Sequence, residues 1–414
     1  MYKRQVPYFS ALSIVYIFSF IFQAFHKYEI DYKNLQGFVG DGAAYMTACA
    51  RTLRSIIGDH FIHIQCWCHK IEKLEKIPAE KFKRLNEFVK NTKKLFKNTR
   101  KRRHNYISFL KKYKKKEKAA KLFPMPVMTR WSSWKKAADY CSEYGADIVQ
   151  YACTLSDQVT VVSYFKSLSE VDVNIILTEA AFVEEHCSSI SYLLVLLSGN
   201  SYPVAHRLYP ALQKISSSFE VIQNAEKLKS VLGEKTKSAS KTLSGSKKSN
   251  VSARIQKVAQ LCVEKLNALM EGDPAEMFFK SIATLLNPVK MMTASAECVE
   301  EAVKNIPLLS GNIPIDQFQV LHCILKEEVK ACKVKDSEKD DVVLKVLSGM
   351  LVTENREFAM RCLQLIYFTV SNVDCERGFS SYGDIVSPKR CQFLTENAET
   401  AMYLYFGDDL SDVE

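Results

Sequence analysis

The sequence predicts a mixed α/β fold that is rich in helix, with part of an α/β core interrupted by a large helical insertion. Three observations support this prediction. A strand–helix–strand pattern occupies residues 37–66, long stretches with helical periodicity follow it, and a helix that begins after Asn372 carries Glu376. We therefore expect segments far apart in the sequence to fold together around one sheet edge.

The first of these patterns is a βαβ unit. Residues 37–40 are a short apolar stretch that ends at Asp41, and residues 61–66 form a second such stretch. Between them one apolar helical face contains Met46, Cys49, Ala50, Leu53 and Ile57. Gly58 is predicted to end this helix. Asp41 then lies at the carboxyl end of the first strand, the edge at which open α/β sheets bind their ligands.

A second carboxylate of interest is Glu376. Asn372 is a good helix N-cap, Glu376 falls in the first turn, and Pro388 ends the helix. A carboxylate in a first turn is stabilised by the helix dipole, so Glu376 either caps its own helix or holds a metal ion. The second role needs a partner, and the best candidate is Asp41, 335 positions earlier.

Helical patterns dominate the sequence between the two carboxylates. Apolar periodicity predicts helices over residues 137–155, 179–197 and 204–228. Residues 233–252 are rich in Lys, Ser and Thr and almost free of large apolar side chains, which predicts a flexible loop. The expected domains are the N-terminal part of the core at 1–75, the helical insertion at 76–340, and the C-terminal part of the core at 341–414.

Positive charge is concentrated in residues 93–121. The chain has a net charge of +11, and this segment holds fourteen Lys and Arg against the single acid Glu117. Short basic runs are commonly solvated helix faces, but this many cations repel one another without an anionic partner. We therefore predict a nucleic-acid partner, and the same run suits nuclear import. The cations expected to contact DNA here are Arg100, Lys101, Arg102, Arg103, Lys114 and Lys115.

The apolar residues 6–24 allow a different interpretation. They carry no charge and follow Lys3 and Arg4, a pattern typical of a signal peptide or a short membrane span. Several serines interrupt the stretch, and its aromatic and β-branched content favours a buried strand and helix. Thirteen cysteines without a repeating spacing indicate reduced thiols of an intracellular protein and argue against secretion, and a membrane-anchored protein stays as the minority alternative.

Four motifs resemble, in order, those of the hAT family of DNA transposases and the proteins derived from them. The segments are GFVGDGAAYM at 37–46, similar to the family's strand-end Asp motif; HIQCWCHKIEKL at 63–74, similar to its C-x-x-H segment; VMTRWSSW at 127–134, similar to T-R-W-N-S; and SNVDCERGFSSYGDIVSPKRCQFL at 371–394, similar to the C-terminal dimerisation region. No single motif is specific, but four in the family's order are hard to obtain by chance.

The resemblance implies an RNase H-like core split by a helical insertion, and DNA cleavage with two Mg²⁺ ions held by three acids. Two cations about 3.5–4 Å apart need carboxylates to bridge and flank them. By position Asp41 resembles the second acid and Glu376 the third, so both would bind Mg²⁺ in an active enzyme. For Cys66 and His69 we see no further zinc ligands at a matching spacing, and a structural role is expected.

The resemblance also implies two binding surfaces. Arg130 and Trp131 match family residues at the DNA cleft, although a core Trp that opens a helix explains Trp131 as well. The C-terminal region is expected to form a homo-oligomer, and its contact residues would be Phe379, Ala398, Met402 and Tyr405.

The family's first acid has no clear counterpart. Only Glu29 and Asp31 are close before Asp41, and neither follows a plausible strand. The family's N-terminal BED-type zinc finger is also absent, so the chain resembles the downstream part of such a protein. We therefore expect a nuclear, DNA-binding, self-associating protein derived from a transposable element and without transposase activity. The alternative is an active hAT transposase with an unrecognised first acid.

Overall fold

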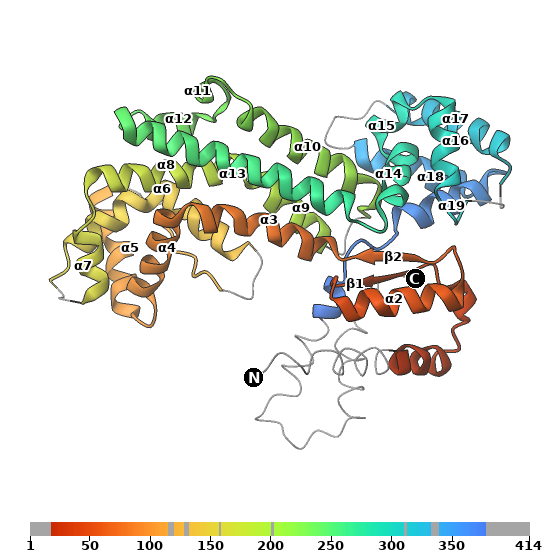
Figure 1. The fold of residues 1–414 in the computed structure, drawn as a ribbon, viewed down its shortest axis with the longest axis horizontal. Helices are drawn as coiled ribbons and strands as arrows, with labels where there is room; N and C mark the ends of the chain where they lie inside the picture. The colour runs from red at the N-terminus through yellow and green to blue at the C-terminus, as the bar shows by residue number, and fades with distance from the viewer. Residues whose placement is uncertain are drawn as a thin grey trace, which may run out of the picture. The chain divides into compact units, whose positions relative to one another are not determined.

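The computed structural model describes residues 18–114, 120–127, 132–156, 159–199, 203–309, 313–332 and 339–377 (Figure 1). These residues form two compact units. Unit 1 takes in the described residues up to Cys68, then Leu197–Ala205, then those from Met277 onward, and unit 2 consists of His69–Leu196 and His206–Glu276. Helices dominate, and the described residues contain one small parallel sheet of two strands. The predicted helix-rich, mixed α/β class is therefore confirmed.

Unit 1 contains the sheet and a group of shorter helices. Its elements are η1 (Tyr32–Asn34), β1 (Gly37–Gly40), α2 (Ala44–Ile57), β2 (Ile62–Gln65), α14 (Glu276–Leu286), α15 (Pro288–Thr293), α16 (Ala296–Lys304), α17 (Ile315–Ala331), α18 (Lys339–Met350) and α19 (Arg356–Ile366). Aromatic side chains pack these helices together: the rings of Phe318 and Phe358 have centroids 5.1 Å apart, and those of Phe278 and Phe368 are 4.7 Å apart.

The predicted βαβ unit is present. β1 and β2 are parallel, with Gly37 opposite Ile62 and Gly40 opposite Gln65, and α2 connects them. Gly58, at φ 123°, ends α2 and donates its N–H to the carbonyl of Arg54. The apolar face of α2 forms a buried cluster, and its members are Cys49, Leu53, Ile57 and Phe61. Phe18 and Ile21, from the apolar stretch near the N-terminus, pack against this cluster.

The regular elements of unit 2 among the described residues are all helices. They are α3 (Trp67–Lys81), α4 (Lys83–Phe96), α5 (Arg100–Lys114), α6 (Ser133–Cys153), α7 (Thr160–Lys166), α8 (Glu170–His186), α9 (Ser188–Ser198), α10 (Ala205–Gln223), α11 (Leu228–Val231), α12 (Glu234–Ser240) and α13 (Gly245–Glu271). α8 packs against α4, α6, α12 and α13. A buried ion pair of 3.3 Å between Lys70 and Asp273 joins α3 to the turn after α13.

The structure corrects the predicted loop at 233–252. α12 covers Glu234–Ser240, and α13 begins at Gly245. The cause lies on α8, where the carboxylate of Glu185 accepts hydrogen bonds from the backbone N–H groups of Lys235 (2.7 Å) and Thr236 (2.9 Å) and from the Thr236 hydroxyl (2.6 Å). A carboxylate at a helix N-terminus accepts hydrogen bonds from the free N–H groups of the first turn and interacts favourably with the helix dipole. Local composition alone gives no sign of this partner.

The sequence assigns residues 277–340 to the helical insertion, whereas the described residues from Met277 onward group with unit 1. One helix boundary also differs from expectation. The single helix predicted over 179–197 is two helices, α8 and α9, which meet at Cys187 with a bend of 46°.

A search for membrane spans among the described residues finds no single helix with enough length and apolar character. The bent pair α8 and α9 meets both criteria together.

Candidate functional site

The carboxyl end of β1 positions Asp41. The Gly40 carbonyl accepts a hydrogen bond of 2.7 Å from the Cys66 N–H, which continues the strand pairing to the last residue before Asp41. Gly42 has φ +81°, a conformation that favours glycine, and it turns the chain toward α2. The Asp41 side chain is exposed, and its Oδ1 accepts a hydrogen bond of 2.9 Å from the Ala43 N–H. The predicted strand-end position of Asp41 is therefore confirmed.

The segment that carries Glu376 lies at the same end of the sheet. The N–H of Trp67, just after β2, donates to the Val370 carbonyl at 3.1 Å, and the N–H of Asn372 donates to the Cys66 sulfur at 3.5 Å. Residues 373–377 are helical, and Glu376 is half-buried in this turn. Cys66 thus hydrogen-bonds both Gly40, which precedes Asp41, and Asn372, which opens the turn of Glu376.

The cap of this turn differs from expectation. The Asn372 side-chain oxygen is buried and accepts no hydrogen bond from the described residues, so the predicted N-cap bond is not formed. Other contacts hold the segment. The Ser371 hydroxyl donates to the Leu197 carbonyl at 3.0 Å, and the Arg377 guanidinium donates to the Ser198 carbonyl and to Asp374. All of these residues belong to unit 1.

Thiols surround the turn of Glu376. Cys66 and Cys68 are both buried. A hydrogen bond with Cys66, burial and the charge of Cys66 raise the pKa of the Cys68 thiol far above its ordinary value, and the Glu376 carboxylate adds to the rise. The raised pKa favours the protonated form of the Cys68 thiol, and sulfur is not a ligand that Mg²⁺ prefers in either form.

This donor set fits two Mg²⁺ ions poorly. Mg²⁺ prefers carboxylate and water oxygens in octahedral geometry, whereas Cys66 and Cys68, next to the segment of Glu376, offer sulfur. In the part of the chain that the structure describes, no three His, Cys, Asp or Glu side chains are grouped in a way that could hold a metal ion. Glu29 and Asp31, the acids closest before Asp41, are exposed, and Asp31 caps η1 through the Lys33 N–H at 3.0 Å.

The basic segment divides into two kinds of cation. Arg100 and Lys101 are exposed at the start of α5. Arg102 and Arg103 are half-buried and turn back to the end of α4, where they donate to the carbonyls of Leu95 (3.4 Å) and Phe96 (2.8 Å). These two arginines therefore satisfy helix-end carbonyls, a structural role that the sequence analysis did not anticipate.

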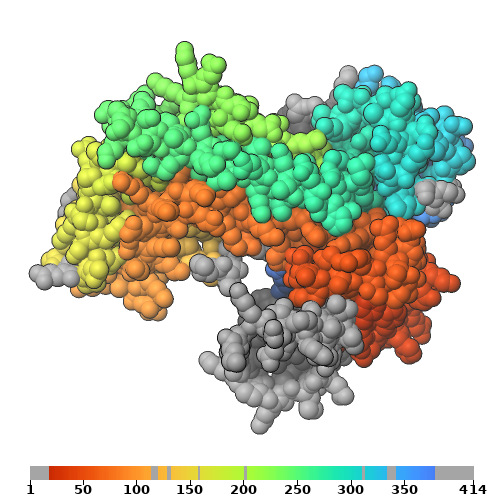
Figure 2. Space-filling model, viewed as in Figure 1, coloured from red at the N-terminus to blue at the C-terminus, as the bar shows by residue number. Residues whose placement is uncertain are grey.

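An aromatic core anchors α5 beneath its cations. Tyr106, Phe109 and Leu110 are buried, and the Tyr151 hydroxyl donates to the Arg102 carbonyl at 3.0 Å. The ring centroids of Phe96 and Tyr106 are 5.0 Å apart. The cations exposed along the end of α4 and along α5 are Lys94, Lys97, Arg100, Lys101, Lys111 and Lys112. Helices α4 and α5 lie at the surface, in orange in Figure 2.

Several predicted site residues fall outside the described residues. They are Lys115, Arg130, Trp131, Phe379, Ala398, Met402 and Tyr405, together with the side chain of Lys114.

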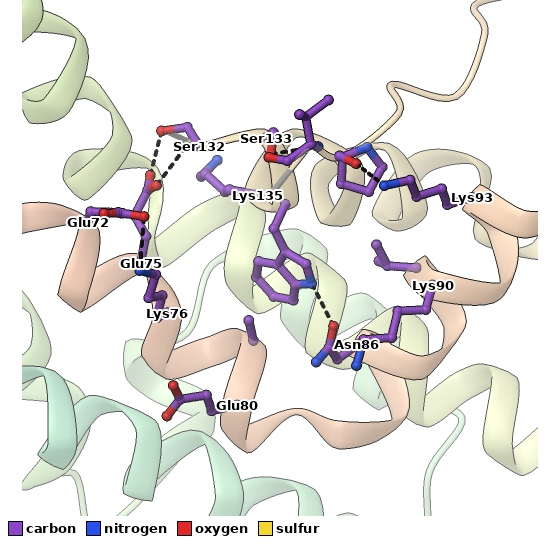
Figure 3. A pocket seen from close by; sticks show the side chains of 15 residues that line it. Glu72, Glu75, Lys76, Glu80, Asn86, Lys90, Lys93, Ser132, Ser133 and Lys135 are labelled. Atoms are coloured by element: carbon purple, nitrogen blue, oxygen red, sulfur yellow. Dashed lines mark hydrogen bonds and ion pairs between the residues drawn. The ribbon is translucent and has the colours of Figure 1, made fainter. Parts of the chain in front are cut away.

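The structure adds a pocket of about 380 Å³ in unit 2, between α3, α4 and the start of α6 (Figure 3). The Trp134 indole N–H donates to the Asn86 side-chain oxygen at 3.2 Å, which fixes the ring. The carboxylate of Glu75 accepts from the N–H (3.0 Å) and hydroxyl (2.7 Å) of Ser132 and from the Ser191 hydroxyl (2.5 Å). The sequence signal for this pocket is Trp134, which lies in the segment compared above with T-R-W-N-S.

Comparison with known proteins identifies no relative: no protein-family model matches the chain, and no curated protein matches it.

Proposed function

We propose that this chain derives from a hAT-family transposase and serves in the nucleus as a DNA-binding, self-associating protein without transposase activity. One observation carries the proposal. The segments of Asp41 and Glu376 lie 335 positions apart and meet at one sheet end through Cys66. An RNase H-like core interrupted by an insertion requires this kind of arrangement. The four motifs in family order add support from the sequence.

DNA binding would use the exposed cations of α4 and α5. Lys and Arg that contact phosphates release counterions, so affinity falls with salt in proportion to the number of contacts. Such contacts give affinity without sequence choice. The proposed partner is therefore duplex DNA, bound mainly through its backbone.

A salt series on a labelled duplex tests this proposal. We expect a steep decrease of affinity with salt for the wild type. The double variant Arg100→Gln/Lys101→Gln should reduce the slope of log K against log salt by about 2. The matched control is Lys247→Gln/Lys248→Gln, which removes the same charge from exposed positions on α13. An equal reduction in both variants would argue against a DNA surface on α5.

The proposal includes the loss of strand cleavage. Only two of the three acids implied by the resemblance have counterparts in this chain, and Cys66 and Cys68, next to the segment of Glu376, offer sulfur, which Mg²⁺ does not prefer. We expect no Mg²⁺-dependent nicking of DNA. The shared sheet end favours a second candidate, an active hAT transposase. Cleavage that disappears in both Asp41→Asn and Glu376→Gln would establish that candidate instead.

Self-association is proposed from the sequence of residues 371–414. Ala398, Met402 and Tyr405 share one face of a predicted helix, a pattern suited to a second copy. We expect sedimentation at micromolar concentration to give a dimer, and Met402→Asp to lower the mass toward that of a monomer. A monomer mass for the wild type at that concentration contradicts this part of the proposal.

A further inference from the structure

The pocket in unit 2 has apolar walls around one indole ring. α3 contributes Ala79, α4 contributes Val89, and Val127 and Trp134 complete the apolar surface. The Trp134 ring is half-buried, and its N–H is already bonded to Asn86. A ligand would therefore contact the apolar, polarisable face of the ring. Planar heteroaromatic rings bind well against such a surface.

Most charges at the pocket are already compensated. Glu72 pairs with Lys76 at 3.0 Å, and Lys135 pairs with Asp139 at 2.7 Å. The Glu75 carboxylate is occupied by the hydroxyls of two serines and a backbone N–H.

Three charges remain. Glu80 comes from α3, and Lys90 and Lys93 come from α4, as Figure 3 shows. Lys93 donates one hydrogen bond, of 2.5 Å, to the Pro126 carbonyl. Within the ranges that the structure describes, none of the three forms an ion pair. The pocket thus combines an aromatic ring with a carboxylate from one helix and two ammonium groups from another.

We propose that this pocket binds a single nucleotide unit. The base would stack against Trp134, its amino edge would donate to Glu80, and its phosphate would pair with Lys90 and Lys93. Carboxylates accept hydrogen bonds from the exocyclic amines of bases, and lysines bind phosphates. A volume of about 380 Å³ lies within the range of small-ligand pockets. The nucleotide comes from one of two sources, a free mononucleotide or an unpaired position in DNA, and the second rests on the proposed DNA binding.

The carboxylate predicts a preference among bases. Adenine, cytosine and guanine carry an exocyclic amine that Glu80 can accept from, and thymine does not. dAMP and dCMP should therefore bind more tightly than dTMP. Glu80→Gln places a donor beside the acceptor, so this variant should bind the three nucleotides more equally.

The test titrates the full chain with dAMP, dCMP, dTMP and inorganic phosphate by calorimetry. In parallel, anisotropy compares a fully paired duplex with the same duplex carrying one unpaired adenine. We expect dAMP to bind, phosphate alone to bind much more weakly, and Lys90→Gln to weaken dAMP about tenfold. The matched control is Lys83→Gln, which removes one exposed charge from the same helix outside the pocket and should leave dAMP affinity unchanged.

Trp134→Phe keeps a ring in the pocket and should retain weakened binding, whereas Trp134→Ala should abolish it. Thermal melting of each variant shows whether the fold is intact, and Lys90→Gln keeps the test decisive if Trp134→Ala unfolds.

The outcomes separate this proposal from the proposed function. If no mononucleotide binds and the unpaired adenine does not increase the affinity for the duplex, the pocket proposal is overturned. Steep salt-dependent binding of the duplex in the same experiments would leave the proposed DNA binding intact. Equal effects of Lys90→Gln and Lys83→Gln also overturn it. Mononucleotide binding without any duplex binding supports the pocket with a free nucleotide as its ligand and contradicts the proposed DNA binding. Tighter binding of the unpaired duplex supports DNA as the source.

Discussion

Different chemical groups stabilise the two units: one kind joins the segments at the sheet end within unit 1, and another kind joins the helices within unit 2. At the sheet end, segments from three parts of the chain are joined largely through backbone N–H groups, those of Cys66, Trp67 and Asn372. In unit 2, helices are also joined by ion pairs of buried charged side chains, Lys70 with Asp273 and Glu179 with the half-buried Arg254. Backbone contacts survive most substitutions, whereas a side-chain ion pair is lost with either partner. Single polar substitutions should therefore destabilise unit 2 more than the sheet end.

The largest effect is expected at Asp273. Its side chain is buried, and it pairs with the buried ammonium of Lys70. Asp273→Ala removes the carboxylate that neutralises this ammonium, and breaking a buried ion pair on one side typically costs about 3–5 kcal/mol. Denaturant unfolding of the variant against wild type measures the loss. The double variant Lys70→Met/Asp273→Leu removes both charges and should recover most of it. A loss no greater than about 1 kcal/mol for Asp273→Ala would remove the main contrast between the two regions.

Glu185 should have the next largest effect. Its carboxylate accepts three hydrogen bonds at the start of α12, and hydrogen bonds to a charged group are worth about 1.5–3 kcal/mol. We expect Glu185→Ala to destabilise the protein by about 2–3 kcal/mol and to speed hydrogen exchange in α12. Unchanged exchange in α12 would mean that packing on α8 alone holds this helix.

The same residue gives a pH dependence. Burial raises the pKa of the Glu185 carboxyl, but the hydrogen bonds from Thr236 and Lys235 outweigh burial and hold the pKa below its ordinary value of 4.5. The stabilisation is therefore complete above the ordinary pKa and is lost as pH falls through the lowered folded-state pKa. We expect the stability difference between wild type and Glu185→Gln to shrink between about pH 6 and about pH 3. A difference that stays constant over this range would exclude the carboxylate charge as its cause.

Two arginines of α5 allow a comparison of stability effects within one segment. Arg103 donates to the Phe96 carbonyl at 2.8 Å, so Arg103→Gln should cost about 1 kcal/mol of stability. Arg100 is exposed, and Arg100→Gln should change stability by less than about 0.5 kcal/mol while it weakens DNA binding. Urea unfolding and the salt series measure the two effects. Equal stability losses would contradict the distinction between a capping arginine and an exposed one.

The smallest effect is expected at Asp41. The hydrogen bond that its Oδ1 accepts from the Ala43 N–H lies at the exposed surface. Asp41→Ala should cost about 0.5–1 kcal/mol, and Asp41→Asn should cost less because the amide oxygen still accepts this bond. A larger loss at Asp41 than at Asp273, in the same unfolding experiment, would reverse the comparison.

The parts of the fold that the sequence predicted well are those set by local pattern. Two short apolar stretches, the apolar helical face between them and Gly58 predicted the βαβ unit, and α2 begins and ends close to the expected residues. The shared sheet end of Asp41 and Glu376 was expected because of the family resemblance, since no local pattern links them. The DNA-cleft and dimerisation residues lie outside the described ranges and stay predictions.

The missed features depend on partners distant in sequence. α12 needs Glu185, about 50 positions earlier, and the pocket needs Asn86 and Lys90 beside Trp134. One missed boundary did have a local signal. Ser169 and Asp172 form a capping box at the start of α8, and this spacing before an apolar run marks a helix start.

The hydrogen bonds between Cys66, Trp67 and residues 370–372 have a consequence for translation. The ribosome releases the two β-strands about 300 residues before Val370, an interval of roughly 15–60 s at ordinary elongation rates. All of unit 2 leaves the exit tunnel during this interval, so its helices can assemble on the nascent chain. Until then water must satisfy the N–H of Trp67, just after β2, and the sheet end is among the last parts of the molecule to mature.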